Sequence, residues 1–232
     1  MTTLRVIVEG RTEARFVTQI LAPHLGMRNV FACASPVITK GKRSGVREGQ
    51  GGGDSYLTWK RDITDWIKQE GRHRDFWFTT MFDLYGLEKV RDFPGYAQAR
   101  CLTDPEAKVA SLEAALGQDI GFERFIPYLQ LHEFESLLLV DPTALRNMFI
   151  EQAKAVDDLA REIADTARPA EHINEGEETR PSGRISKHLP AYANNKVVAG
   201  IDAAGNIGLD RLVAACPHFG AWVQRLAKLG SA

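Results

Sequence analysis

Acidic side chains follow three apolar stretches of the sequence, each at the point where the stretch ends. These acids are Glu9, Asp83 and the pair Glu133 and Glu135. The stretches contain many β-branched and aromatic residues, which is typical of strands. Because the carboxyl ends of parallel strands meet at one edge of a sheet, we expect the acids to lie close together. Carboxylates gathered there repel one another unless they take up protons or bind a hard cation.

Mg²⁺, or Mn²⁺ in its place, is the cation that such oxygen ligands favour, and its usual chemistry is on phosphates. The metal would polarise a phosphate and activate a water molecule, so phosphodiester cleavage or phosphoryl transfer is the predicted reaction. Lysines near the site would stabilise the negative charge of the transition state. The predicted metal ligands are Glu9, Asp83, Glu133 and Glu135, and the predicted catalytic residues are Glu9, Glu13, Asp83, Lys187 and Lys196.

Two better-known sites do not match the sequence. His132 precedes the Glu133 pair, but the second histidine of a zinc-protease motif is missing because Ser136 stands at its position. A phosphate-binding loop is also incomplete, since Pro36 replaces its first glycine and Arg43 replaces its Ser or Thr. His132 itself is a candidate metal ligand or general acid, or a hydrogen-bond partner that holds a carboxylate in place.

A basic, glycine-rich stretch follows the second predicted extended segment, near residue 38. Its apolar residues follow no helix or strand period, so we expect a loop. The positive charges of this loop could hold a nucleic-acid backbone; the alternative is a solvated surface loop. Arg184 begins a second, sparser basic set. The predicted nucleic-acid contacts are Lys40, Lys42, Arg43, Arg47 and Arg184.

The composition limits the classes of function. Among 232 residues, 29 basic and 30 acidic side chains give a formal net charge of −1, so nucleic-acid binding must depend on local patches. The three cysteines are widely spaced, which argues against a zinc site or a disulfide framework. The chain begins with no signal-peptide pattern and has no apolar run long enough for a membrane span, so we expect a cytoplasmic protein.

Helical and strand patterns alternate through the first part of the chain. This alternation predicts an α/β fold with a mainly parallel sheet flanked by helices. Residues 1–140 form the expected α/β core. Residues 141–232 read almost entirely as helices and are expected to be a helical elaboration packed on that core.

Several segments together resemble a bacterial Toprim-related family, domain of unknown function 4276. The segments are residues 8–13, 83–86, 130–135, Ser186-Lys187 and 216–219, and the similarity covers nearly the full length of the chain. The first segment, residues 8–13, resembles the Toprim motif in which a glutamate stands at the end of a strand. The resemblance implies a Toprim-like sheet with Glu9 as the catalytic glutamate, Asp83 as the first acid of the second motif, and Glu133 or Glu135 as a further ligand.

The resemblance also implies Mg²⁺-dependent cutting of DNA or RNA by an antiphage effector that works with an ATPase of the ABC or AAA type. The usual second motif is Asp-x-Asp, whereas Tyr85 occupies its last position here. Glu13, Glu133 or Glu135 would then complete the site. The alternatives are a non-catalytic subunit that binds and regulates the ATPase, and an enzyme acting on a small phosphorylated substrate; a homo-oligomer is also possible.

Overall fold

A five-stranded parallel sheet forms the centre of the computed structural model, which describes residues 1–37, 55–174 and 179–231. The strand order is β2-β1-β3-β4, and β5 pairs with the end of β3. The strands are β1 (Thr2–Val8), β2 (Val30–Pro36), β3 (Phe76–Asp83), β4 (Phe125–Ile126) and β5 (Leu129–Gln130). The predicted α/β class is confirmed.

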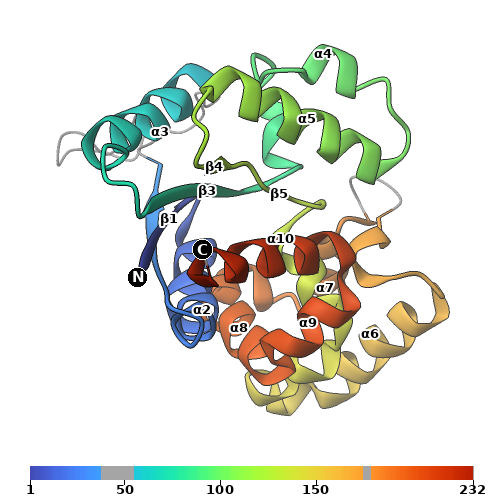
Figure 1. Ribbon diagram of the computed structural model, residues 1–232. Coiled ribbons are helices and arrows are strands. Elements are labelled where there is room, and N and C mark those ends of the chain that lie inside the picture. The colour runs from blue at the N-terminus through green and yellow to red at the C-terminus, as the bar shows by residue number, and fades with distance from the viewer. Residues whose placement is uncertain (38–54, 175–178, 232) are drawn as a thin grey trace, which may run out of the picture.

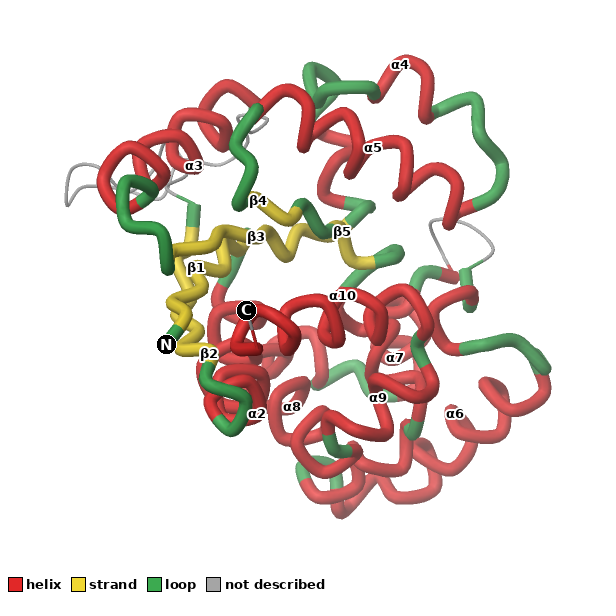
Figure 2. Tube along the Cα trace, in the orientation of Figure 1, coloured by secondary structure: helices red, strands yellow, loops and turns green. Residues whose placement is uncertain are grey.

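Helices cover both faces of this sheet (Figures 1 and 2). On one face lie α3 (Tyr56–Glu70), α4 (Tyr96–Ala99) and α5 (Pro105–Ile120). On the other lie α1 (Arg11–Phe16), α2 (Ala22–Gly26), α6 (Ala153–Asp165), α7 (Pro181–His188), α8 (Tyr192–Ile207), α9 (Leu209–Ala215) and α10 (Pro217–Ala227). Short 3₁₀ segments, including Gly86–Lys89 and Phe134–Val140, connect several of these elements.

The strands divide their side chains between two hydrophobic cores, one on each face. In β1, Leu4, Val6 and Val8 pack with the C-terminal helices, whereas Ile7 packs with α3 and α5. This alternation follows from the two-residue period of a strand. Because both faces are buried, the strand sequences are almost continuously apolar, as in other covered parallel sheets.

The apolar stretch that precedes Glu133, residues 125–131, forms two short strands, β4 and β5, with a break between them. Pro127 has no backbone N–H to donate to a sheet ladder. At the break, the Thr80 hydroxyl accepts from Tyr128 N and donates to Tyr128 O, both at 2.9 Å. A side chain of β3 therefore satisfies the backbone groups that the interrupted pairing leaves, and β5 then resumes beside Phe82 and Asp83.

The C-terminal helices share their core with β1, β2 and α1. Phe16 meets Phe134 and Phe219 edge to face, with ring centroids 5.5 and 5.9 Å apart. Trp222 of α10 stacks on Tyr128 at 4.1 Å and donates to the Thr79 hydroxyl of β3 at 2.9 Å. Within the described ranges, no helix has the length and apolarity needed to cross a membrane.

Glu171 connects two distant segments of this half of the molecule. Its side chain is fully buried and accepts hydrogen bonds from the first amides of α10, His218 N and Phe219 N, each at 3.0 Å. Burial raises the pKa of Glu171, while these two hydrogen bonds oppose the rise. The carboxyl group thus supplies acceptors for two N–H groups that have no partner within the helix because they lie at its N-terminus.

We expect Glu171→Ala to lower the free energy of unfolding by about 2 kcal/mol or more, because two buried amides lose their acceptor. Urea denaturation followed by circular dichroism measures this loss. Glu151→Ala, at an exposed position, is the matched control. Equal stability of both variants would show that the buried cap contributes nothing.

Candidate functional site

Glu9 and Asp83 meet where β1 and β3 end. The strands pair in parallel register with Val8 opposite Met81, so their last residues reach the same edge of the sheet. Asp83 N donates to Glu9 Oε2 at 2.9 Å. The hydrogen bond holds the Glu9 carboxylate against the end of the neighbouring strand.

Gly86 leaves the space that Glu9 occupies. A Cβ atom added at residue 86 would lie 2.5 Å from Glu9 Oε1 and 2.8 Å from Oε2, well inside van der Waals contact. Gly86 begins the short 3₁₀ segment after β3, so the close approach is made by backbone alone. The glycine is therefore required by the position of the carboxylate.

We expect Gly86→Ala to displace the Glu9 carboxylate from Asp83 N while the fold persists, since only a flexible side-chain end must move. The affinity of the strand-end acids for Mg²⁺, the cation that the sequence predicts, should fall about tenfold or more, because a misplaced carboxylate loses its alignment. The melting temperature of the variant should differ little from that of the wild type. Gly205→Ala, on α8 with open space around it, is the control; a Mg²⁺ affinity equal to that of this control would contradict the expectation.

Asp83 is the most strongly perturbed acid of the site. Its Oδ1 atom is buried and has no hydrogen-bond partner in the described part of the chain. Burial raises the pKa of Asp83 well above its usual value, and nearby negative charges add to the rise. These charges belong to Glu13, Glu9, Glu135 and Glu133. Four carboxyl groups are thus close enough to raise the pKa of a fifth.

Helix α8 closes this cluster on the side of Glu13 and Glu135. The Tyr192 hydroxyl donates to Glu135 Oε1 at 3.2 Å, and Lys196 Nζ lies 3.3 Å from the same oxygen. Burial raises the pKa of Glu135; the charge of Lys196 opposes this rise. Burial also raises the pKa of Glu13, and the charge of Glu135 contributes. One lysine therefore compensates only part of the negative charge.

Glu133 turns toward the start of α7. Its Oε2 atom accepts from Ser182 N at 2.9 Å, and Arg180 Nε lies 3.8 Å from its Oε1 atom. Only 8% of the residue is exposed. Glu133 thus belongs to the acidic cluster by charge but is also tied to the C-terminal helices by hydrogen bonds.

The remaining predicted residues lie elsewhere. Lys187 Nζ is 3.4 Å from Glu162, and its side chain is mostly exposed. Arg184 is buried, donates to Thr179 O, and pairs with Glu162 at 2.6 Å, so its guanidinium group serves this internal ion pair. Hydrogen bonds from His188 and Arg184 lower the pKa of Glu162 to about 2 despite its partial burial. Lys40, Lys42, Arg43 and Arg47 lie outside the described residues.

The acids suit a hard cation by their chemistry and by the unpartnered oxygen of Asp83. Among the described residues, no three His, Cys, Asp or Glu side chains already converge as a metal-binding group. Mg²⁺ commonly uses only one or two protein carboxylates and keeps several waters. Glu9 and Asp83 are the pair that would hold the ion, because the hydrogen bond from Asp83 N keeps the Glu9 carboxylate next to Asp83.

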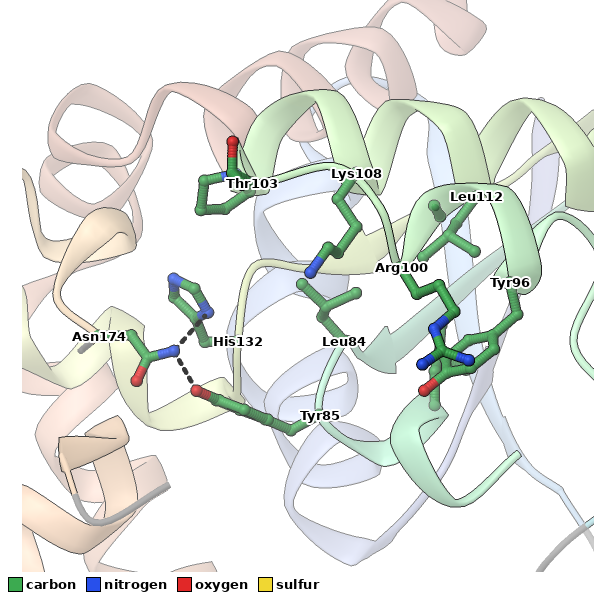
Figure 3. A pocket seen from close by; sticks show the side chains of 12 residues that line it. Leu84, Tyr85, Tyr96, Arg100, Thr103, Lys108, Leu112, His132 and Asn174 are labelled. Carbon is green, nitrogen blue, oxygen red and sulfur yellow. Dashed lines mark hydrogen bonds between the residues drawn. The ribbon is translucent and has the colours of Figure 1, made fainter. Parts of the chain in front are cut away.

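A pocket of about 480 Å³ opens beside the cluster (Figure 3). Residues next to the acids in the chain line one wall: Leu84 and Tyr85 follow Asp83, and His132 precedes Glu133. Asn174 donates to the Tyr85 hydroxyl and lies 3.4 Å from His132 Nδ1. Burial lowers the pKa of His132 to about 4, and the charges of His172 and Lys108 add to this effect.

The sequence patterns missed several of these residues. Tyr192, Ser182 and Arg180 contact the acids from the C-terminal helices, and none of these three positions belongs to a motif. Gly86 had a signal, because it lies three residues after the strand-end Asp83, within the segment 83–86 that carries the family resemblance, and a glycine allows close backbone approach. Arg100 and Lys108, which line the pocket, had none.

A family model described as "Domain of unknown function (DUF4276)" matches residues 8–227. The match covers the strand ends, the acidic cluster and the helices that close it. No curated protein and no solved structure matches the chain. The family match carries no statement about Toprim domains, so that resemblance stays a prediction.

Proposed function

The chain belongs to the DUF4276 family, and for it we propose a Mg²⁺-dependent nuclease that hydrolyses phosphodiester bonds of DNA or RNA. One observation carries the proposal: Asp83, with an unpartnered buried oxygen, is surrounded by four further carboxyl groups at the strand ends. Such a cluster is costly to bury without protons or a cation. Perturbed acids of this kind are typical of catalytic sites.

Glu9 and Asp83 would hold the ion, and Glu13, Glu133 or Glu135 would complete the site. When bound, Mg²⁺ supplies charge stabilisation for a phosphate oxygen and a more acidic water. Lys196, which pairs with Glu135, would face the charge that develops on the phosphate. Glu13 keeps a proton to higher pH than an ordinary glutamate, which suits it to protonate a leaving oxygen.

The test uses the purified full-length chain and labelled single- and double-stranded DNA and RNA. We expect cleavage with Mg²⁺ or Mn²⁺ and none with EDTA. Isothermal titration calorimetry should show Mg²⁺ binding that is lost in Asp83→Asn. If neither binding nor cleavage occurs, the nuclease proposal is wrong, and a non-catalytic subunit of an ATPase assembly becomes the better explanation.

A further inference from the structure

The pocket beside the acidic cluster is lined by cations and hydrogen-bond donors. Arg100 follows α4, and Lys108 lies in the first turn of α5. Among the described residues that line the pocket there is no Asp or Glu. Neither cation has a carboxylate partner in the described part of the chain. The lining therefore favours an anionic ligand, in contrast to the acids a few residues away.

His132 adds a buried donor to this lining. Its side chain is part of a residue only 5% exposed, and Nε2 has no partner within the described residues. Asn174 Nδ2, a donor, faces His132 Nδ1, so Nδ1 accepts and Nε2 carries the hydrogen. Figure 3 shows the ring on the same side of the pocket as the Lys108 ammonium group. A buried N–H without an acceptor is costly and indicates a missing partner.

The backbone at His132 has an unusual conformation that fits this role. Its φ of 63° lies in the left-handed region, which residues other than glycine seldom adopt. Tyr85 N donates to His132 O at 3.1 Å and so helps to hold the turn. Such strain concentrates at functional sites, where the surrounding structure supports it.

The pocket also offers apolar and aromatic surface suited to a flat ring. Tyr85 and Tyr96 contribute aromatic faces, and Leu84, Leu87 and Leu112 contribute apolar ones. Its volume of about 480 Å³ is within the range of small-ligand sites. The lining thus combines an anion-binding end with a surface on which a base could stack.

We propose that this pocket binds a nucleotide through its terminal phosphate, with Lys108 and His132 Nε2 as the phosphate contacts and with Arg100, which Figure 3 shows beside Tyr96 on the other side of the pocket, as a further positive charge. The proposal rests on the proposed function in taking a nucleotide unit as the ligand. It adds that the pocket recognises the phosphorylated end of a nucleic-acid strand, or that a free mononucleotide occupies the pocket and regulates the neighbouring site. Both sources share one chemistry, a phosphate monoester on a nucleoside.

The test measures binding without metal, so that cleavage does not interfere. Glu9→Gln protein in EDTA is titrated calorimetrically with adenosine 5′-monophosphate and with adenosine. A five-nucleotide strand with a 3′ fluorophore, bearing either a 5′-phosphate or a 5′-hydroxyl, is followed by anisotropy. We expect the phosphorylated probes to bind about tenfold or more tightly than their counterparts.

Lys108→Gln should weaken binding of the phosphorylated probes about tenfold, and Arg100→Gln, which removes a more distant charge of the pocket, should weaken it less. The control Lys68→Gln, on the exposed side of α3, should leave it unchanged. His132→Asn is a further variant, because asparagine tolerates a positive φ but its side chain is shorter. Tighter binding of the phosphorylated strand than of the mononucleotide would identify a strand end, and the reverse order a free nucleotide.

Two outcomes would overturn the inference: no saturable binding of any phosphorylated probe, or equal affinities of the Lys108 variant and the Lys68 control. These outcomes are separate from a failure of the proposed function. A wild-type chain that binds phosphorylated probes but never cleaves nucleic acid would contradict only the nuclease proposal. A chain that cleaves without using the pocket would contradict only the inference.

Discussion

Replacing Glu9 by glutamine is expected to lower Mg²⁺-dependent cleavage by about 100-fold or more, the scale of losing a general base. The amide keeps one oxygen that can still accept from Asp83 N, so the strand ends should stay together. The carboxylate charge, which a cation and a proton acceptor both require, is lost. Initial rates on a labelled strand measure the effect.

Glu123→Gln, at an exposed position, is the control for this substitution. Both variants should melt at nearly the wild-type temperature. If Glu9→Gln cleaves at the wild-type rate, Glu9 is not catalytic. If it loses activity only because it unfolds, the residue is structural, and circular dichroism separates these cases.

Asp83→Asn should have two opposite effects, a more stable metal-free protein and the loss of cleavage. An ionised Asp83 is buried among other carboxylates, whereas asparagine fills the same space without charge. Each kcal/mol of relieved repulsion raises the melting temperature of a chain of this size by about 2–4 °C. Differential scanning calorimetry in EDTA measures the gain, and an activity assay measures the loss.

The stability gain should depend on pH in a defined direction. Because the pKa of Asp83 is raised in the folded state, the native protein binds more protons than the unfolded chain above the ordinary pKa. Repulsion at Asp83 therefore destabilises the metal-free wild type increasingly as pH rises from about 4. The advantage of Asp83→Asn should be small near pH 4 and larger at pH 8.

Mg²⁺ should reverse this order. The ion is expected to raise the melting temperature of the wild type at pH 8, since it binds only the folded site, but not that of Asp83→Asn. If the wild type is more stable than Asp83→Asn in EDTA at every pH, repulsion between Asp83 and the other carboxylates does not dominate at this position.

Much of the fold was predictable from the sequence because its signals are local. Strands that end in acids and alternate with helices indicate a parallel sheet, and the pairing of β1 with β3 does bring Glu9 and Asp83 together. The break at Pro127 was less evident, because the Thr80 hydroxyl that compensates for it lies on another strand. Only the tertiary structure brings these residues together.

The choice between two candidate lysines shows the same limit. Lys187 and Lys196 both lie in helical segments. Although Ser186-Lys187 is part of the family resemblance, no spacing in the sequence tells which lysine reaches the acids. In the structure, Lys196 reaches Glu135, whereas Lys187 reaches Glu162 on α6. The packing of α8 against the Phe134–Val140 segment and of α7 against α6 decides this difference, and no local pattern encodes it.

The contacts of α7 and α8 with the acids also determine when the site can form during synthesis. Ser182, Tyr192 and Lys196 are translated more than forty residues after Glu135. A nascent chain that ends near residue 140 holds all five acids but none of these partners. The ribosome must therefore release the chain through α8 before the acids are enclosed, so translation products that end before α8 lack a finished site.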